Sequence, residues 1–77
     1  MVNFTNIKVE GNYIFAIAEA VDYNHEQRRV KLHIKNEECY IEGSDDYVKG
    51  TIMRACWCLQ DRSNKRELCT NETVAWY

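Results

Sequence analysis

The feature that most limits the fold is a strict alternation of basic and apolar residues from Arg29 to Lys35. Val30, Leu32 and Ile34 take every second position, and basic residues or histidine stand between them. In an extended chain, successive side chains point to opposite faces, so all three apolar residues share one face. The segment therefore predicts a β-strand with one buried face and one face open to water.

The residues that follow allow this strand to form an antiparallel hairpin. A turn at residues 36–37 sets Leu32 opposite Ile41 on the inner face. The same turn sets Lys31 opposite Glu42 on the outer face, and such cross-strand pairs contribute roughly 0.2–1 kcal/mol each. We predict that the inward residues are Val30, Leu32, Ile34 and Ile41, and that the outward ones are Lys31, His33 and Lys35.

Composition extends the β prediction to the rest of the chain. Val and Ile together number twelve against three Leu, and nine residues are aromatic. β-branched and aromatic side chains favour strands over helices. We predict an all-β fold, a small antiparallel meander or barrel-like sheet of about six to seven short strands. The expected strands lie near residues 4–9, 13–22, 28–35, 38–42, 50–60, 66–70 and 73–77.

Two segments, residues 13–22 and 47–60, fit a helix as well as a strand. In the first segment, both faces are apolar or small, so the two-residue period of a strand cannot be distinguished from the period of a buried helix. In the second, Val48, Ile52 and Leu59 follow helical spacing, although residues 53–59 also alternate. If both segments are helical, the order becomes β-α-β-β-α-β, a ferredoxin-like α+β fold. The sequence leaves this alternative open.

Length and charge limit the classes of protein to which the chain can belong. Its 77 residues are expected to form a single domain, residues 1–77. No run approaches the ~20 apolar residues of a membrane span, and no basic-then-apolar leader opens the chain, so we expect a cytoplasmic protein without membrane contact. A formal net charge of −2 argues against a strongly basic nucleic-acid binder.

Catalytic patterns are scarce. The chain has two His and two Ser, and it contains neither a Gly-X-Ser-X-Gly nor a His-Glu-X-X-His motif. We therefore expect no enzymatic activity and no cofactor.

Four cysteines are the residues best suited to metal chemistry. A second hairpin, with its turn at residues 62–65, would place Cys58 beside Cys69, and Cys56 would share the face of Cys58. With Cys39 as a fourth ligand, these thiols could bind zinc. Two cysteines on one flat strand do not enclose a metal, however, and a free cysteine commonly behaves as a small buried hydrophobe. We predict that Cys58 and Cys69 are neighbours, that no metal binds, and that a zinc-stabilised domain is the alternative.

The remaining functional signals are surface residues. A basic row on strand 28–35 lies beside one tyrosine, and two aromatic residues end the chain. Trp and Tyr are enriched at binding hot spots, and an open sheet edge can pair with a second copy. The candidate binding residues are Trp76, Tyr77, Tyr40, His33, Arg29 and Lys31.

We therefore expect a small non-enzymatic domain that binds another protein or associates with itself as a weak homodimer. By analogy of size and charge alone, it could be an accessory or phage-type inhibitor protein. Besides the zinc-stabilised domain, the alternative is a weak nucleic-acid-binding module that uses the basic strand 28–35.

Overall fold

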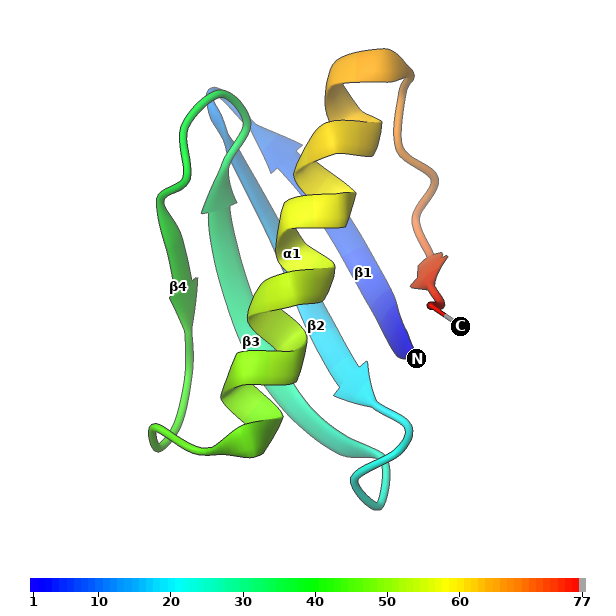
Figure 1. The fold of residues 1–77 in the computed structure, drawn as a ribbon. Helices are drawn as coiled ribbons and strands as arrows, with labels where there is room; N and C mark the ends of the chain where they lie inside the picture. Colours follow the sequence, from blue (N-terminus) through cyan, green and yellow to red (C-terminus); the bar gives the residue numbers. More distant parts are fainter. Residues whose placement is uncertain (77) are drawn as a thin grey trace.

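In the computed structural model, which describes residues 1–76, five strands form one antiparallel sheet and a helix packs on one of its faces (Figure 1). The elements are β1 (Val2–Glu10), β2 (Tyr13–Ala20), β3 (Glu26–His33), β4 (Cys39–Ile41), α1 (Tyr47–Lys65) and β5 (Glu72–Val74). The strand order is β4-β3-β2-β1-β5. The first four strands form a meander, and the chain then returns through α1 to add β5 beside β1. The predicted antiparallel, β-rich fold is confirmed, although a helix takes the place of the expected strand at 50–60 and residues 66–70 form no strand.

Residues 13–20 form the central strand β2, so the ferredoxin-like alternative is wrong. β2 pairs along its whole length with β3 and, around an irregularity, with β1. Its inward side chains are Ile14, Ala16, Ala18 and Ala20, which are all buried. The small alanines leave room above the centre of the sheet, and this room lets α1 pack closely against it.

The predicted faces of the β3–β4 hairpin are confirmed, whereas the predicted register is wrong. Val30 lies opposite Ile41, and Lys31 lies opposite Tyr40. The pairing is therefore shifted by two residues from the expected one, because the connection between the strands is longer than a two-residue turn. A shift by an even number leaves every side chain on its predicted face. Accordingly Val30 and Ile41 are buried, and Lys31 is exposed.

Residues 47–65 form the helix α1, so the expected strand at 50–60 is wrong, and residues 66–70 form no strand either. Asp46 caps the helix, because its side chain accepts a hydrogen bond from the Lys49 backbone N–H. The buried stripe of the helix consists of Val48, Ile52, Ala55, Cys56 and Leu59. This stripe lies against the inner face of the sheet. Its residues are three or four positions apart, as in a helix, whereas a strand would bury every second residue.

Arg28 points inward from β3, unlike the other basic residues of that strand, and it holds the loop that leads into the helix. Its guanidinium donates to both Asp46 carboxylate oxygens, at 3.3 and 2.9 Å, and to the Ser44 carbonyl oxygen at 3.2 Å. Gly43 lies directly against this side chain and has a φ of +104°. The Arg28–Asp46 pair therefore fastens the beginning of α1 to the sheet.

Gly43 and Gly50 should respond in opposite ways to substitution by alanine. A Cβ at Gly43 would lie 2.9 Å from Arg28 Nη1 and would impose an unfavourable φ, so Gly43→Ala should cost about 1–3 kcal/mol of stability. Gly50 lies in α1 with open space around it, so Gly50→Ala should add about 0.5–1 kcal/mol. Urea unfolding of both variants measures the difference, and equal effects would contradict the assigned backbone.

Candidate functional site

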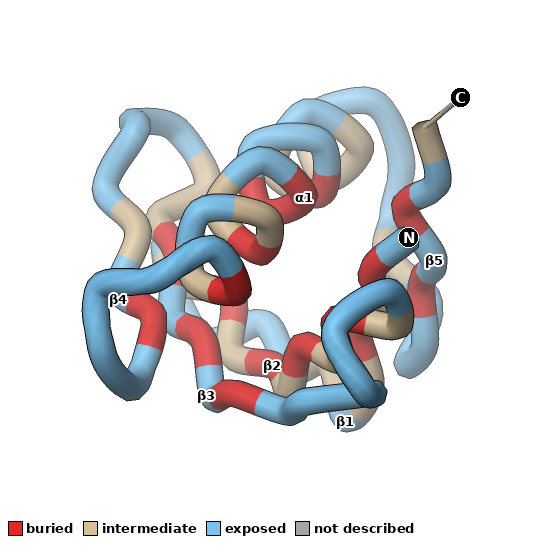
Figure 2. The backbone as a smooth tube through the Cα atoms, turned by 60° about the horizontal axis from the view of Figure 1, so that its bottom comes forward, coloured by how far each residue is buried: buried red, intermediate tan, exposed pale blue. Residues whose placement is uncertain are grey.

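The face of the sheet opposite α1 is not covered by any element of residues 1–76. Figures 1 and 2 show the helix lying on one side of the strands. On the open face, Tyr13 lies opposite His33 and Phe15 lies opposite Lys31, while Lys31 also lies opposite Tyr40. Three neighbouring strands thus bring five side chains together. We call this cluster the outer patch: Tyr13, Phe15, Lys31, His33 and Tyr40.

Lys31 is at the centre of the outer patch. Its Nζ lies 4.4 Å from the centroid of the Tyr13 ring and 5.7 Å from that of Phe15. Within residues 1–76, no carboxylate forms a salt bridge with this ammonium group. A cation over an exposed aromatic ring gains roughly 0.5–1 kcal/mol. The two rings therefore position a charge that remains free to bind an outside group.

The aromatic rings of the outer patch are accessible but ordered by their neighbours. Tyr13 and His33 pack edge to face, with ring centroids 5.2 Å apart. Tyr40 is 64% exposed. Together with Lys31 and Glu38, Tyr13 and Tyr40 line a surface hollow of about 390 Å³. The hollow offers aromatic walls, one cation and one carboxylate, which suits the mixed polar and apolar side chains of a protein surface.

Four of the six predicted binding residues share the open face. They are Arg29, Lys31, His33 and Tyr40, and Arg29 Nε lies 3.8 Å from a Glu42 carboxylate oxygen. Trp76 lies elsewhere: the Arg54 guanidinium is 5.3 Å from its ring, and both residues line a separate hollow with Trp57. The sixth candidate, Tyr77, lies outside the described residues.

Sequence reasoning missed Tyr13 and Phe15, which bring aromatic rings into the basic row. Their signal is the alternation of Tyr13, Phe15, Ile17 and Glu19 with buried residues along β2. The segment was expected as a strand, but both of its faces are apolar or small, so the sequence did not indicate which face is open.

The cysteines do not form the predicted arrangement. Because residues 47–65 are helical, the hairpin that would place Cys58 beside Cys69 does not form, and both residues are exposed. In the part of the chain that is described, no three His, Cys, Asp or Glu side chains are grouped so that they could hold a metal ion. The set Cys56, Cys58, Cys69 and Cys39 therefore does not assemble as zinc ligands.

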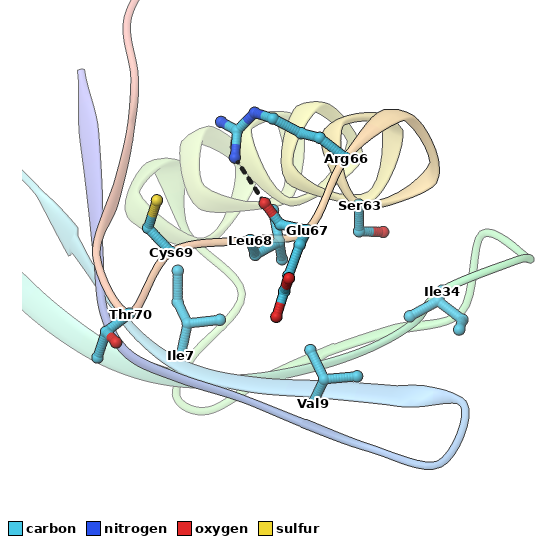
Figure 3. A pocket seen from close by; sticks show the side chains of 9 residues that line it. All are labelled: Ile7, Val9, Ile34, Ser63, Arg66, Glu67, Leu68, Cys69 and Thr70. Atoms are coloured by element: carbon cyan, nitrogen blue, oxygen red, sulfur yellow. Dashed lines mark hydrogen bonds between the residues drawn. The ribbon is translucent and has the colours of Figure 1, made fainter.

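A cavity of about 460 Å³ lies near the C-terminal end of α1, between β1 and the segment that follows the helix (Figure 3). Its apolar walls come from Ile7, Val9, Ile34 and Leu68. The cavity is also lined by Arg66, whose guanidinium group already donates hydrogen bonds to the Glu67 carbonyl oxygen and to the Glu72 carboxylate. The outer patch is therefore the better candidate site, because within residues 1–76 no carboxylate forms a salt bridge with Lys31.

Comparisons with protein-family models, with curated proteins and with solved structures found no match. Within residues 1–76, no helix combines the length and the hydrophobicity that crossing a membrane requires.

Proposed function

We propose that this protein is a small non-enzymatic domain that binds another protein through the outer patch. The observation that carries the proposal is the clustering of three aromatic rings around Lys31, which forms no salt bridge within residues 1–76, on a sheet face that no described element covers. Buried aromatic and cationic anchors dominate the energy of protein interfaces. We further propose an accessory or inhibitory role in the cytoplasm, as the size and charge of the chain suggest.

The sheet edges are less suitable for binding than the open face. β4 and β5, the two edge strands, are three residues long each. A short edge offers few backbone groups for pairing with another chain. We therefore place the interface on the face, and a weak homodimer would use the same patch on two copies.

The charges around the outer patch favour a protein over a nucleic acid. Glu38 lines the hollow beside Lys31, and Glu42 lies near Arg29. Carboxylates at these positions would repel a phosphate backbone, and the chain as a whole has a net charge of −2. Mixed charge around aromatic rings is instead typical of the rim of a protein interface.

Photo-crosslinking from the patch tests the proposal. A benzophenone amino acid replaces Tyr40 in the full chain, and a matched variant carries it at Tyr47, which is 85% exposed at the start of α1. We expect a discrete protein adduct in host cells from position 40 and none from position 47. Lys31→Glu on the same background should reduce the adduct, because loss of a hot-spot charge weakens binding by about tenfold or more.

The adduct also separates the possible partners. A product of twice the chain mass identifies a second copy, and a different mass identifies a heterologous protein. A nuclease-sensitive product would instead support nucleic-acid binding through strand 28–35. Equal adducts from positions 40 and 47, or adducts insensitive to Lys31→Glu, would contradict binding through the outer patch.

A further inference from the structure

Two of the four cysteines meet inside the molecule. Cys39 lies on β4, two residues before the buried Ile41, and therefore faces α1. Cys56 belongs to the buried stripe of α1 and is fully inaccessible. Cys39 packs against the buried core to which Cys56 belongs, and α1 contacts β4. Cys58 and Cys69, by contrast, are both exposed.

The two thiols differ in access and in acidity. Cys39 is half-buried, so solvent reaches it, whereas Cys56 is covered. The neighbouring Cys56 thiol lowers the pKa of Cys39. The neighbouring Cys39 thiol, together with burial, raises the pKa of Cys56. Cys39 is therefore the thiol that ionises first, and the thiolate is the form that reacts with oxidants.

We propose that Cys39 and Cys56 are an oxidative modification site, where hydrogen peroxide converts the two thiols into an intramolecular disulfide. In the first step, the Cys39 sulfur attacks one peroxide oxygen and the O–O bond breaks, giving Cys39 sulfenic acid and one water. In the second step, the Cys56 sulfur attacks the Cys39 sulfur, and the S–O bond breaks with release of a second water. The peroxide gains two electrons, and the two thiols lose two electrons and two protons.

The disulfide would link β4, the short edge strand of the hairpin, covalently to α1. β4 is held to the sheet by a three-residue ladder with β3. Tyr40 follows Cys39 directly, so oxidation would also fix the position of one aromatic ring of the outer patch. This last consequence rests on the proposed function, whereas the disulfide itself does not.

Peroxide treatment of the full chain tests the site without any binding partner. After oxidation and alkylation with N-ethylmaleimide, we expect a linked peptide pair containing Cys39 and Cys56, while Cys58 and Cys69 carry the label. The unlabelled oxidised protein should lose the mass of two hydrogen atoms and recover it with dithiothreitol. A crosslink that closes a loop of this length should raise the melting temperature by roughly 10 °C or more.

Matched variants keep the test decisive. Cys39→Ser should abolish the linked pair, and it removes only a half-buried sulfur, so the fold should be retained. The double variant Cys58→Ser, Cys69→Ser should form the disulfide as the native chain does. A linkage through Cys58 or Cys69, oxidation of Cys39 that stops at the sulfinic acid, or continued labelling of Cys39 would overturn the proposal. None of these outcomes bears on partner binding, so the two proposals fail separately.

Discussion

Substituting Glu72 with glutamine should lower the free energy of unfolding by about 2–4 kcal/mol. The Glu72 side chain is only 6% exposed, although it carries a charge. Its two carboxylate oxygens accept hydrogen bonds of 2.8 and 2.7 Å from Arg66 and one of 3.3 Å from Arg62. Glutamine preserves the volume but removes the charge, so two guanidinium groups lose their counter-ion. The range is below that of a fully buried pair because Arg66 is half exposed.

The same carboxylate connects the end of α1 to the edge strand β5. It accepts a further hydrogen bond of 2.8 Å from the Cys69 backbone N–H, and Arg62 also donates to the Thr73 carbonyl oxygen. Urea unfolding measures the loss, with Glu67→Gln as the matched control. Glu67 is exposed, so its substitution should change stability by no more than about 0.5 kcal/mol. Similar losses in the two variants would contradict the role assigned to Glu72.

Acidification gives a second measurement of this interaction. The Arg66 hydrogen bonds, followed by that of the Cys69 N–H and the charge of Arg62, lower the pKa of Glu72 from 4.5 to about 2, against the opposing effect of burial. Because the pKa is lower in the folded state, the stabilisation is complete above the unfolded value and is lost as the pH falls towards 2. The stability difference between the native chain and Glu72→Gln should therefore shrink from pH 5 to pH 2. A difference independent of pH would show that charge is not its cause.

The sequence predicts a face more readily than a register. The alternation from Arg29 to Lys35 determines which side chains are buried, because the period of a strand is two. It does not determine where β4 pairs, because an even shift preserves every face and the connecting residues contain no strong turn signal. The open-face position of Lys31 and Tyr40 could thus be predicted, but their direct pairing could not.

The interactions missed by the sequence depend on residues far apart in the chain. Arg28 stands two residues before Val30 and so has the same phase as the buried positions of β3, yet its charge suggested an outward direction. Its partner Asp46 becomes visible only when β3 and the start of α1 are placed together. Glu72 is similar, because a buried carboxylate is recognised by its arginine partners and not by its own position.

Residues 47–60 show why local periodicity was insufficient. Met53, Trp57 and Leu59 alternate as in a strand, and Val48, Ile52 and Leu59 repeat as in a helix. The two patterns differ in which side chains they bury, and the choice between them depends on the partner surface. The alanine-rich inner face of β2 accommodates a helix, and the helical stripe is the one that it buries.

That choice leads to a stability prediction for Ile52 and Trp57. Ile52 is fully buried in the stripe of α1 that faces the sheet, whereas Trp57 on the same helix is 48% exposed. Ile52→Ala should cost about 2–5 kcal/mol, because it removes buried methylene groups and leaves a cavity. Trp57→Ala should cost no more than about 1 kcal/mol, because a half-exposed ring contributes little to the core. A strand with the alternation of Met53 to Leu59 would reverse this order, since Trp57 would then face inward and Ile52 outward. Urea unfolding of the two variants therefore distinguishes the helix from the strand, and a larger loss for Trp57→Ala would contradict the helix.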